Sequence, residues 1–438
     1  MSFDLPSLPE SWNYAPLDSC CQKNSVTYGV VQPGAALAEG KPLIRVNNFR
    51  DTRIDLGDVM YIAPEIEAKY SRTRLKGGEV LLTIVGSVGQ VAVVPSRFAG
   101  FNVARAVAVI HPLKHISPDW IALCLRSPLS QHLLGSRANT TVQTTINLKD
   151  LRALPIPLPP EDERRTISEF VGALDDRIAL LRETNATLEA VAQTLFKSWF
   201  VDFDPVRAKM EGRVPEGMDE ATAALFPDGF EESELGLVPR GGRVSTLVDA
   251  FEINPTRKLT KGSMASYLDM ASLATSGHCV EAPIQREMGS GAKFRNGDTL
   301  LARITPCLEN GKSAFVDFLV EGQIGWGSTE FLVLRPKAPL PEYFGYLLCR
   351  HPAFREFAIQ SMSGTSGRQR IQNDVLGRYL LALPGREIGL AFGEIIESIQ
   401  KSIASNHEKA QTLATLRDTL LPRLISGQLR LPEVEEFA

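Results

Sequence analysis

The chain contains an internal repeat, and this feature constrains its fold more than any other. Several short segments recur in the same order along the 438 residues. The recurring pairs are GEVLL at 78–82 with GDTLL at 297–301, PDW at 118–120 with PEY at 341–343, RSP at 126–128 with RHP at 350–352, and Ile146 and Leu151 with Ile371 and Leu376. The offset rises from 219 through 223 and 224 to 225, as small loop insertions would make it. So long a period excludes a solenoid and predicts two similar domains related by a pseudo-twofold axis.

A long helix is predicted to follow each domain, because the offset stays at 225 through a stretch with coiled-coil spacing. Seam positions step by three and four residues without a break. The apolar pairing residues are Val171, Leu174, Ile178, Leu181, Leu188 and Leu195 in the first copy, and Ile396, Ile399, Ile403, Leu413 and Leu420 in the second. Residues 167–200 alone would span about 50 Å at about 1.5 Å per residue. We expect the two helices to pair antiparallel, although packing of each helix into its own domain would leave a similar stripe.

Three seam positions carry polar side chains, namely Asn185, Asn406 and Arg417. A buried asparagine in a helical seam fixes the register of the pair at some expense of stability. Polar seam residues can equally lie exposed to solvent. The sequence leaves both possibilities open.

The net charge of −4 hides an uneven distribution of charge along the chain. Residues 1–155 carry a net charge of +4 and residues 241–385 a net charge of +3, whereas 156–240 carry −9 and 386–438 carry −2. Basic blocks are typical of surfaces that meet nucleic acid, although chance variation between segments would also produce such numbers. The predicted segments are two globular domains at 1–155 and 236–385, and two helical regions at 156–235 and 386–438.

Each globular domain is predicted to be of mixed α+β type. Short apolar runs at 80–85, 91–95, 299–304 and 330–334 are typical of strands, and glycines separate them. Helical segments follow Pro118 and Pro341. The predicted fold class is therefore α+β, with two globular domains separated by a long antiparallel coiled coil.

A polar stretch lies late in each domain, at residues 136–147 and 361–373. Arginine can donate two hydrogen bonds to guanine, glutamine and asparagine can pair twice with adenine, and serine or threonine reaches a base or a phosphate. Such stretches are also common in solvated loops without any ligand. The candidate DNA-binding residues, which also include two basic residues outside these stretches, are Arg137, Thr141, Gln143, Thr144, Asn147, Arg303, Lys312, Arg368, Gln369, Arg370, Gln372 and Asn373.

Searches for catalytic motifs favour a binding protein. The GKS at 311–313 lacks the earlier glycine of a phosphate-binding loop, because position 306 is proline. Asp202 and Asp204 have no histidine or basic companion at nuclease-like spacing, and the six histidines and six cysteines form no metal-ligand pattern. We therefore predict no catalytic residue, no metal site and no cofactor in this chain. The chain lacks a signal peptide or membrane-spanning run, so we expect a cytoplasmic protein.

Several segments resemble the specificity subunit of Type I restriction-modification systems. The strongest resemblance covers residues 154–170 (LPIPLPPEDERRTISEF) and 194–209 (TLFKSWFVDFDPVRAK), which are similar to the central conserved region of that family. Residues 309–312, 325–331 and 420–427 are also similar to family segments. Two departures are Gly242, where a tryptophan is usual, and Arg164, where a glutamine is common.

The resemblance implies a non-catalytic subunit with two target-recognition domains, each reading one half of a bipartite site in double-stranded DNA. It implies that the helices set the spacing and dock two methyltransferase subunits, to which two motor-nuclease subunits can be added. Those partners are expected to use S-adenosylmethionine, ATP and Mg. Family recognition domains vary in sequence, so no base contact is transferred. The alternatives are a nuclease or methyltransferase active by itself, and a coiled-coil scaffold without affinity for DNA.

Overall fold

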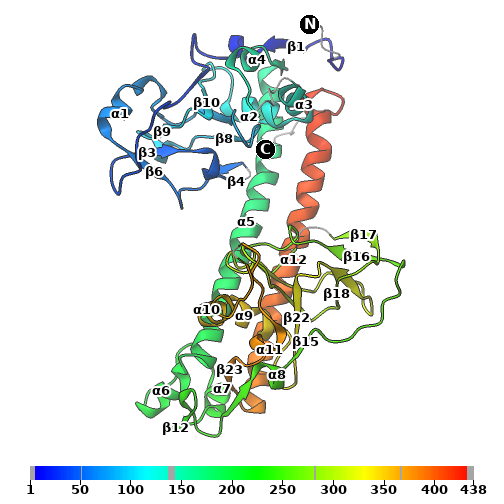
Figure 1. Ribbon diagram of the computed structural model, residues 1–438. Helices are drawn as coiled ribbons and strands as arrows, with labels where there is room; N and C mark the ends of the chain where they lie inside the picture. The colour runs from blue at the N-terminus through cyan, green and yellow to red at the C-terminus, as the bar shows by residue number, and fades with distance from the viewer. Residues whose placement is uncertain (1–4, 51, 137–143, 281–282, 366, 432–438) are drawn as a thin grey trace, which may run out of the picture. The chain divides into compact units, whose positions relative to one another are not determined.

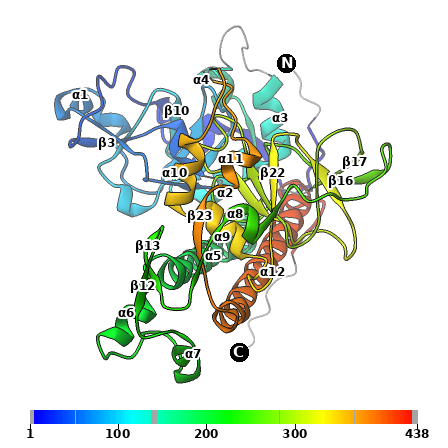
Figure 2. The same ribbon diagram turned by 60° about the horizontal axis from the view of Figure 1, so that its bottom comes forward.

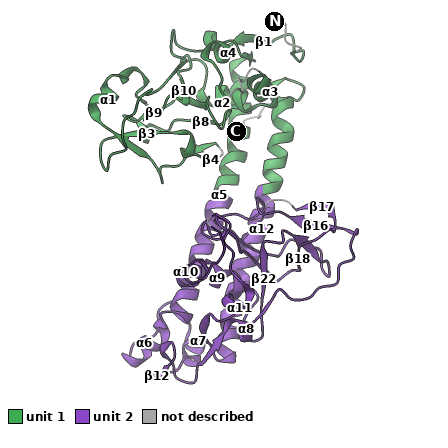
Figure 3. Ribbon diagram, viewed as in Figure 1, with its two compact units in different colours: residues 1–179, 411–438 green, residues 180–410 purple. Residues whose placement is uncertain are grey.

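The computed structural model describes residues 5–50, 52–136, 144–280, 283–365 and 367–431. The chain divides into two compact units, which we call unit 1, with residues 1–179 and 411–438, and unit 2, with residues 180–410 (Figure 3). Helices and strands occur in both units, which confirms the predicted α+β class. Within the described residues no helix is long and apolar enough to cross a membrane.

Two helices of 40 residues each, α5 (Glu161–Phe200) and α12 (Arg386–Ile425), are the longest elements in the described chain (Figure 1). Prolines precede α5, so it cannot extend upstream, and three acidic residues in its first turn suit the positive end of the helix dipole. After α12 the chain turns at Gly427, whose φ of +70° is typical of a helix C-cap. Each helix is about 60 Å long at about 1.5 Å per residue.

The two long helices pack antiparallel, as predicted. In unit 1 the core contains Val171 from the beginning of α5 and Leu424 from the end of α12. In unit 2 the core contains Ile396 from the beginning of α12 and Trp199 from the end of α5. Each unit thus combines the start of one helix with the end of the other.

Unit 1 contains a globular domain built from short strands and helices. Its helices are α1 (Pro64–Ala68), α2 (Pro118–Arg126), α3 (Pro128–Ser136) and α4 (Leu148–Arg152). Its strands are β1 (Asn13–Pro16), β2 (Thr27–Tyr28), β3 (Lys41–Ile44), β4 (Phe49–Arg50), β5 (Arg53–Ile54), β6 (Met60–Ile62), β7 (Val80–Thr83), β8 (Val91–Val93), β9 (Asn102–Val103), β10 (Val107–Ile110) and β11 (Pro155–Leu158). The sheet orders are β2-β10-β7-β8 and β6-β3-β9, with the pairs β1-β11 and β4-β5 beside them.

Unit 2 repeats this plan. Its helices besides the long ones are α6 (Asp204–Met210), α7 (Glu220–Leu225), α8 (Leu247–Ala250), α9 (Phe344–Arg350), α10 (Pro352–Gln360) and α11 (Asn373–Leu376). Its strands are β12 (Phe230–Ser233), β13 (Gly236–Pro239), β14 (Arg243–Thr246), β15 (Phe251–Ile253), β16 (Met264–Leu268), β17 (Ile284–Glu287), β18 (Ala292–Phe294), β19 (Thr299–Ala302), β20 (Ser313–Phe315), β21 (Gly325–Gly327), β22 (Phe331–Pro336) and β23 (Leu380–Leu383). The sheet orders are β15-β22-β19-β20 and β17-β16-β21-β18, with the pairs β14-β23 and β12-β13 beside them.

The sheets of the two units have corresponding strand pairings. Each globular domain contains a four-stranded antiparallel sheet, β2-β10-β7-β8 in unit 1 and β15-β22-β19-β20 in unit 2. The second sheet of each unit contains one parallel pair, β3 with β9 in unit 1 and β16 with β21 in unit 2. Strands β7 and β19 are buried along their whole length, which explains why both are continuous apolar runs broken only by threonine. The repeat in the sequence is therefore a repeat of the fold.

Both cores use the same five helical positions. Unit 1 buries Ile167 and Val171 of α5 with Leu421, Leu424 and Ile425 of α12. Unit 2 buries Phe392 and Ile396 of α12 with Phe196, Trp199 and Phe200 of α5. Each residue of one set lies 225 positions from its counterpart in the other set, which is the offset that the sequence predicts. These positions carry aliphatic side chains in unit 1 and mostly aromatic side chains in unit 2. In unit 2 the rings of Phe200 and Phe392 meet edge to face, with their centroids 4.6 Å apart.

One part of unit 2 has no counterpart among the described residues of unit 1. Helices α6 and α7 and the β12-β13 hairpin follow α5 and lie away from β16 and β17 (Figure 2). Lys209 of α6 ties this segment together by donating to the carbonyl oxygens of Ala223, at 3.2 Å, and Phe226, at 2.5 Å. Lys197, near the end of α5, forms an ion pair with Asp202, one of the two carboxylates considered above.

Candidate nucleic-acid interface

The polar segment of unit 2 forms a tight hairpin at residues 363–370. The backbone N–H of Ser363 donates to the carbonyl of Arg370 at 3.0 Å, and the reverse bond is 2.9 Å long. Gly364 and Gly367 in the turn have φ angles of +129° and +77°, in the range that glycine adopts without strain. Most described residues of the turn are exposed. The 363–370 hairpin is therefore a projecting loop on a hydrogen-bonded stem.

The stem is joined to the central sheet just after β19. Ile371 donates its backbone N–H to the carbonyl of Arg303 at 3.0 Å, and Gln369 and Thr305 exchange two bonds of 3.1 Å, one of them to the Thr305 hydroxyl. Arg303 in turn donates its backbone N–H to the carbonyl of Glu330 at 3.0 Å. Three segments far apart in the sequence meet here.

Arg370 and Glu330 form a bidentate ion pair across this junction. The Nη2 and Nε atoms of Arg370 donate to the two carboxylate oxygens of Glu330 at 2.7 and 2.9 Å. These hydrogen bonds lower the pKa of Glu330, because they stabilise its charged form. The guanidinium of Arg370, predicted as a base reader, is thus bound within the protein.

Arg303 closes the other side of the junction. Its Nη2 donates to the carbonyl of Ile371 at 2.6 Å and to the side chain of Gln372 at 3.3 Å. Burial lowers the pKa of Arg303, and this effect outweighs the attraction of nearby Glu330. Arg303 therefore supports the base of the hairpin from the strand beneath it.

The other predicted residues of unit 2 differ in their surroundings. Lys312 donates to the backbone carbonyl of Met270 at 2.7 Å, which is a structural contact. Arg368, Gln372 and Asn373 are exposed. Among the described residues, none forms a hydrogen bond or an ion pair with the guanidinium of Arg368, at the tip of the hairpin. Arg368 is thus the side chain in this region that is best placed to meet a ligand.

In unit 1 the corresponding segment is described from Thr144 onward. Thr144 accepts a backbone bond of 3.0 Å from Gly86, and Asn147 caps α4 by accepting the backbone N–H of Asp150 at 2.8 Å. Asn147 therefore has a structural role at a helix N-terminus. Arg137, Thr141 and Gln143 lie outside the described residues.

The same backbone framework supports both segments. Ile146 donates to the carbonyl of Ile84 at 2.9 Å, and Ile84 donates to the carbonyl of Ala106 at 2.8 Å, as Ile371, Arg303 and Glu330 do in unit 2. The side chains on this framework nevertheless differ. The positions equivalent to Arg303, Glu330 and Arg370 in unit 1 are Ile84, Ala106 and Thr145. The charged cluster therefore belongs to the second copy alone, as far as the described residues show.

The predicted pairing residues all lie at least partly buried along the long helices. Fully buried members are Val171, Ile178, Leu181, Ile396 and Ile403, and half-buried members are Leu174, Leu188, Leu195, Ile399, Leu413 and Leu420. In unit 2, Asn406 donates to the side-chain oxygen of Asn185 at 3.0 Å, and Asn185 donates to the carbonyl of Ile403 at 3.0 Å. The two seam asparagines are thus part-buried partners.

The third polar seam residue, Arg417, belongs to an ion cluster in unit 1. Its Nη1 lies 2.7 Å from one oxygen of Asp175 on α5, and Arg126 of α2 lies 2.8 Å from the other oxygen. The side chains of Asp175, Arg126 and Arg417 are 14%, 19% and 21% exposed. Asp175 therefore joins the recognition domain to both long helices.

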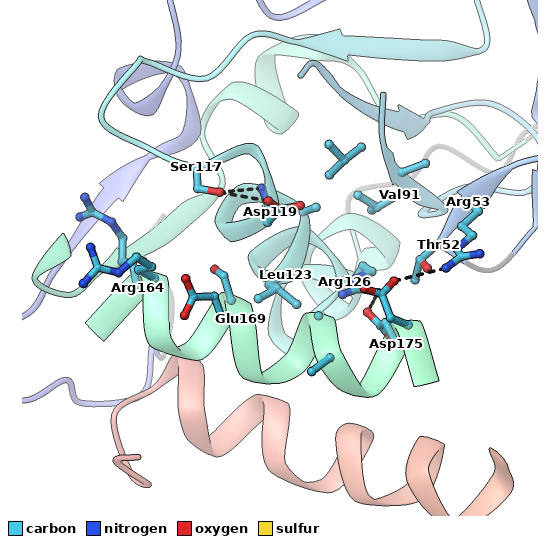
Figure 4. A pocket seen from close by; sticks show the side chains of 18 of the residues that line it. Thr52, Arg53, Val91, Ser117, Asp119, Leu123, Arg126, Arg164, Glu169 and Asp175 are labelled. Carbon is cyan, nitrogen blue, oxygen red and sulfur yellow. Dashed lines mark hydrogen bonds and ion pairs between the residues drawn. The ribbon is translucent and has the colours of Figure 1, made fainter. Parts of the chain in front are cut away.

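Arg126 and Asp175 form one end of a hollow of about 720 Å³ in unit 1. Figure 4 shows Arg164, Glu169 and Asp175 projecting from α5 into it, opposite Asp119 of α2. Arg53 reaches its rim and pairs with Asp176 at 3.2 Å. Acidic and basic side chains alternate along the hollow, so it has no strong preference for ligands of either charge.

In unit 2 the corresponding space is filled by a chain segment. His278 is fully buried, with its Nδ1 2.8 Å from the Tyr343 hydroxyl and its Nε2 3.1 Å from Asp317. Gln400 of α12 donates to the same carboxylate at 2.6 Å. The wall positions Val93, Ala122 and Asp175 of the hollow correspond to Phe315, Tyr346 and Gln400 in the surroundings of His278. The two units thus share their walls and differ in the loop that covers them.

Comparison with known proteins identifies this fold. Residues 18–190 match the family model described as the Type I restriction modification DNA specificity domain. The chain carries a Type I specificity domain. The match to this domain begins in unit 1 and ends in the second half of α5. It confirms the family that the sequence predicts.

Curated relatives of this specificity domain are specificity subunits. The chain is 36% identical to the Type I restriction enzyme EcoBI specificity subunit of Escherichia coli over 38% of this chain and 35% of that protein. It is 24% identical to the HindI specificity subunit of Haemophilus influenzae over 82% of this chain and 88% of that protein. Both relatives are specificity subunits, the class that the sequence resembles.

A solved structure supports the fold over nearly the whole chain. It is the Type I restriction-modification S subunit of M. genitalium, with a TM-score of 0.53 and 15% identity. The alignment covers 96% of this chain and 98% of that chain. The likeness therefore extends beyond the residues that match the specificity domain.

Sequence reasoning did not find Glu330, the residue that organises the hairpin stem. It lies in the segment 325–331, which the sequence marks as similar to the family without giving it a role. A lone glutamate before an apolar strand gives no sign of its partner 40 positions later. The first copy of the repeat has Ala106 at the equivalent position. This difference between the two copies is the sequence signal that could have drawn attention to Glu330.

Proposed function

We propose that this chain is the DNA-recognition subunit of a Type I restriction-modification complex, in which each recognition domain reads one half of a bipartite site. The main support is that one backbone framework occurs twice and carries different polar side chains in each copy. A backbone framework that occurs twice with different surface side chains is expected to bind two different half-sites. The exposed Arg368 at a projecting hairpin has the chemistry for guanine or a phosphate.

We further propose that the long helices set the spacing between the half-sites. Half-sites read from one face of DNA lie about 34 Å apart for each helical turn. A helix of 40 residues, about 60 Å long, is of the right order to fix such a separation. The part-buried Asn185–Asn406 pair supports a single register of the helices.

The same helices are proposed to dock two methyltransferase subunits, with motor-nuclease subunits joining them. On α5 in unit 2, Leu180 and Val191 are 51% and 44% exposed, and on α12 in unit 1 Leu416 is 43% exposed. These apolar side chains lie outside the seam and would be covered by a partner helix. S-adenosylmethionine, ATP and Mg would act in the partner subunits.

The test is co-expression of this chain with its methyltransferase partner, followed by modification-sensitive sequencing of host DNA. We expect methylation at one bipartite motif with a fixed gap. The partner expressed without this chain is the control and should leave that motif unmodified. Methylation that follows no motif would contradict sequence recognition, and methylation by this chain alone would make it an enzyme. Failure of the assembled pair to bind DNA would instead favour a scaffold.

A further inference from the structure

A second hollow, of about 390 Å³, lies in unit 2 beside the foot of the 363–370 hairpin. Its cationic lining residues are Arg257, Lys293 and Arg303, and no carboxylate is among the described residues that line it. The remaining lining is neutral, with Asn254, Thr256 and Thr329 as further hydrogen-bonding groups. The hollow is therefore suited to an anion rather than to a neutral molecule.

Two of its arginines have hydrogen-bond donors without acceptors. The Nε atoms of Arg257 and Arg303 are shielded from solvent and have no partner among the described residues. The side chain of Arg257 is only 7% exposed. A buried donor without an acceptor is unfavourable, and such groups in native proteins usually have a partner. Both Nε atoms are closed off from solvent, so a ligand in the hollow could reach them only after the side chains shift, and the case for an anion rests on the charges that line the hollow.

The charges around the hollow do not cancel. Arg257 is compensated by Asp298, whose two oxygens lie 2.5 and 2.6 Å from its Nη2. Lys293 donates only to the backbone carbonyls of Arg257 and Leu259, at 3.3 and 3.2 Å, so its charge has no counter-ion among these contacts. Arg303 shares the single carboxylate of Glu330 with Arg370. An excess of positive charge thus remains where Lys293 and Arg303 meet the hollow.

We propose that the hollow lined by Arg257, Lys293 and Arg303 binds a backbone phosphate of DNA beside the half-site that unit 2 reads. This inference rests on the proposed function and adds a ligand class and a site to it. A phosphate there fixes the position of the hairpin on the duplex, while Arg368 meets a base edge. Phosphate contacts position a protein on DNA and base contacts specify the sequence. A free phosphate ion shares this chemistry, and the test separates the two.

The site is expected in unit 2 and not in unit 1. Ile84 stands at the position of Arg303 in the other copy, on the same backbone hydrogen bonds. Arg303→Ile therefore places in unit 2 a side chain that the same framework already carries. The backbone bonds of the surrounding strands can remain in this variant, but the hairpin base loses the Arg303 side-chain bonds to Ile371 and Gln372, so a second variant that leaves those bonds in place is needed beside it.

The first measurement is binding of duplex DNA by the complex of this chain with its methyltransferase partner, over a series of salt concentrations. The probes are a duplex with the mapped site and an unrelated duplex of equal length. Arg303→Ile should weaken both by a similar factor, on the order of tenfold, and should lower the salt slope by about one. A loss confined to the mapped site would mean that Arg303 acts through base reading, which would overturn the phosphate assignment.

The second measurement locates the phosphate by replacing single phosphates with neutral methylphosphonates, one position at a time. In the native complex one such replacement beside the unit 2 half-site should weaken binding, and the same replacement should have no further effect on Arg303→Ile. Equal losses at every position in native and variant complexes would refute the site. If the native complex binds no DNA at all, the proposed function itself fails, which is a different outcome.

A second variant protects the test against misfolding. Lys293→Met keeps the aliphatic stem and removes the charge, and it should show the same salt slope and the same insensitive phosphate position as Arg303→Ile. Thermal unfolding of both variants serves as the folding control. Stabilisation of the native chain by inorganic phosphate, with no coupling to any DNA phosphate, would assign the hollow to a free anion and overturn the proposal.

Discussion

At the scale of single residues, two arginines near each other in the 363–370 hairpin have different roles. The guanidinium of Arg370 is held by both oxygens of Glu330. Arg368 lies exposed at the turn, and no partner for its guanidinium is found among the described residues. The sequence predicts both as DNA-binding residues because they are the same residue type in the same stretch. Their surroundings make Arg370 a positioning residue and Arg368 the candidate contact.

Arg368→Ala should relax recognition at one base pair of the half-site read by unit 2 and leave the other half-site unchanged. A bidentate contact to a base contributes about 1–3 kcal/mol of discrimination, so the preference at that position should fall by about ten- to a hundredfold. Methylation maps of the co-expressed complex would show it. Arg378→Ala is the matched control, since Arg378 is a 75% exposed arginine that pairs with Asp374 on α11. Unchanged preferences in Arg368→Ala would remove it from the interface.

Glu330→Gln should reduce stability in a pH-dependent way. Bonds from Arg370 lower the pKa of Glu330 in the folded state, so its contribution is present above the pKa of an unfolded glutamate, about 4.3, and is lost as pH falls through the folded-state value. The free energy of unfolding should drop by about 1 kcal/mol or less at pH 7, because the pair is partly exposed. Denaturant unfolding at pH 7 and pH 3 would measure both values. An equal drop at both pH values would contradict the ion-pair explanation.

At the scale of elements, both units combine the start of one long helix with the end of the other. Unit 1 adds an ion cluster to this packing, in which Asp175 of α5 accepts from Arg126 of α2 and Arg417 of α12. Asp175 is 14% exposed, so its carboxylate depends on these two partners rather than on water. The seam residue Arg417 is polar because it has a carboxylate to meet across the helix pair.

Asp175→Asn should destabilise unit 1, because two mostly buried guanidinium groups would lose their shared carboxylate. We expect the free energy of unfolding to fall by about 2 kcal/mol, between the values for a charged hydrogen bond and for a broken buried pair. Chemical denaturation of the full chain would measure it. Asp176→Asn, one position along and 81% exposed, is the control and should have little effect. Equal effects of the two substitutions would refute the role of the cluster.

The helices could be predicted from sequence because their signal is periodic and occurs twice. Seam positions such as Val171 and Ile396 depend only on local spacing, and the repeat confirms one copy from the other. Contacts of the recognition domains could not be predicted in this way. The pairing of Glu330 with Arg370, and the burial of His278 in a space that is open in unit 1, depend on loops whose paths no local pattern determines.

At the scale of the whole molecule, the repeat joins two similar domains to helices that both units share. Each compact unit contains parts of both long helices, so neither copy of the repeat forms a compact unit from its own residues alone. The proposed spacing function can therefore be tested by changing the length of these helices. The sequence sets this length through an unbroken seam in each helix.

Insertion of one heptad between Val171 and Trp199, with a matching heptad in α12, should lengthen the gap in the DNA site by about three base pairs. Seven residues add about 10 Å to a helix, and DNA rises about 3.4 Å for each base pair. Both half-sites should keep their bases. Methylation mapping of native and lengthened chains would compare them, and a changed base within either half-site would contradict the spacing role.

The charged cluster of Arg303, Glu330 and Arg370 makes the two copies of the repeat chemically different. Ile84, Ala106 and Thr145 replace it in the other copy, so the two copies share a backbone framework but differ in its chemistry. Under the proposed function, two chemically different copies would read two different half-sites. We therefore expect an asymmetric, non-palindromic target, which the complex accepts in one orientation only.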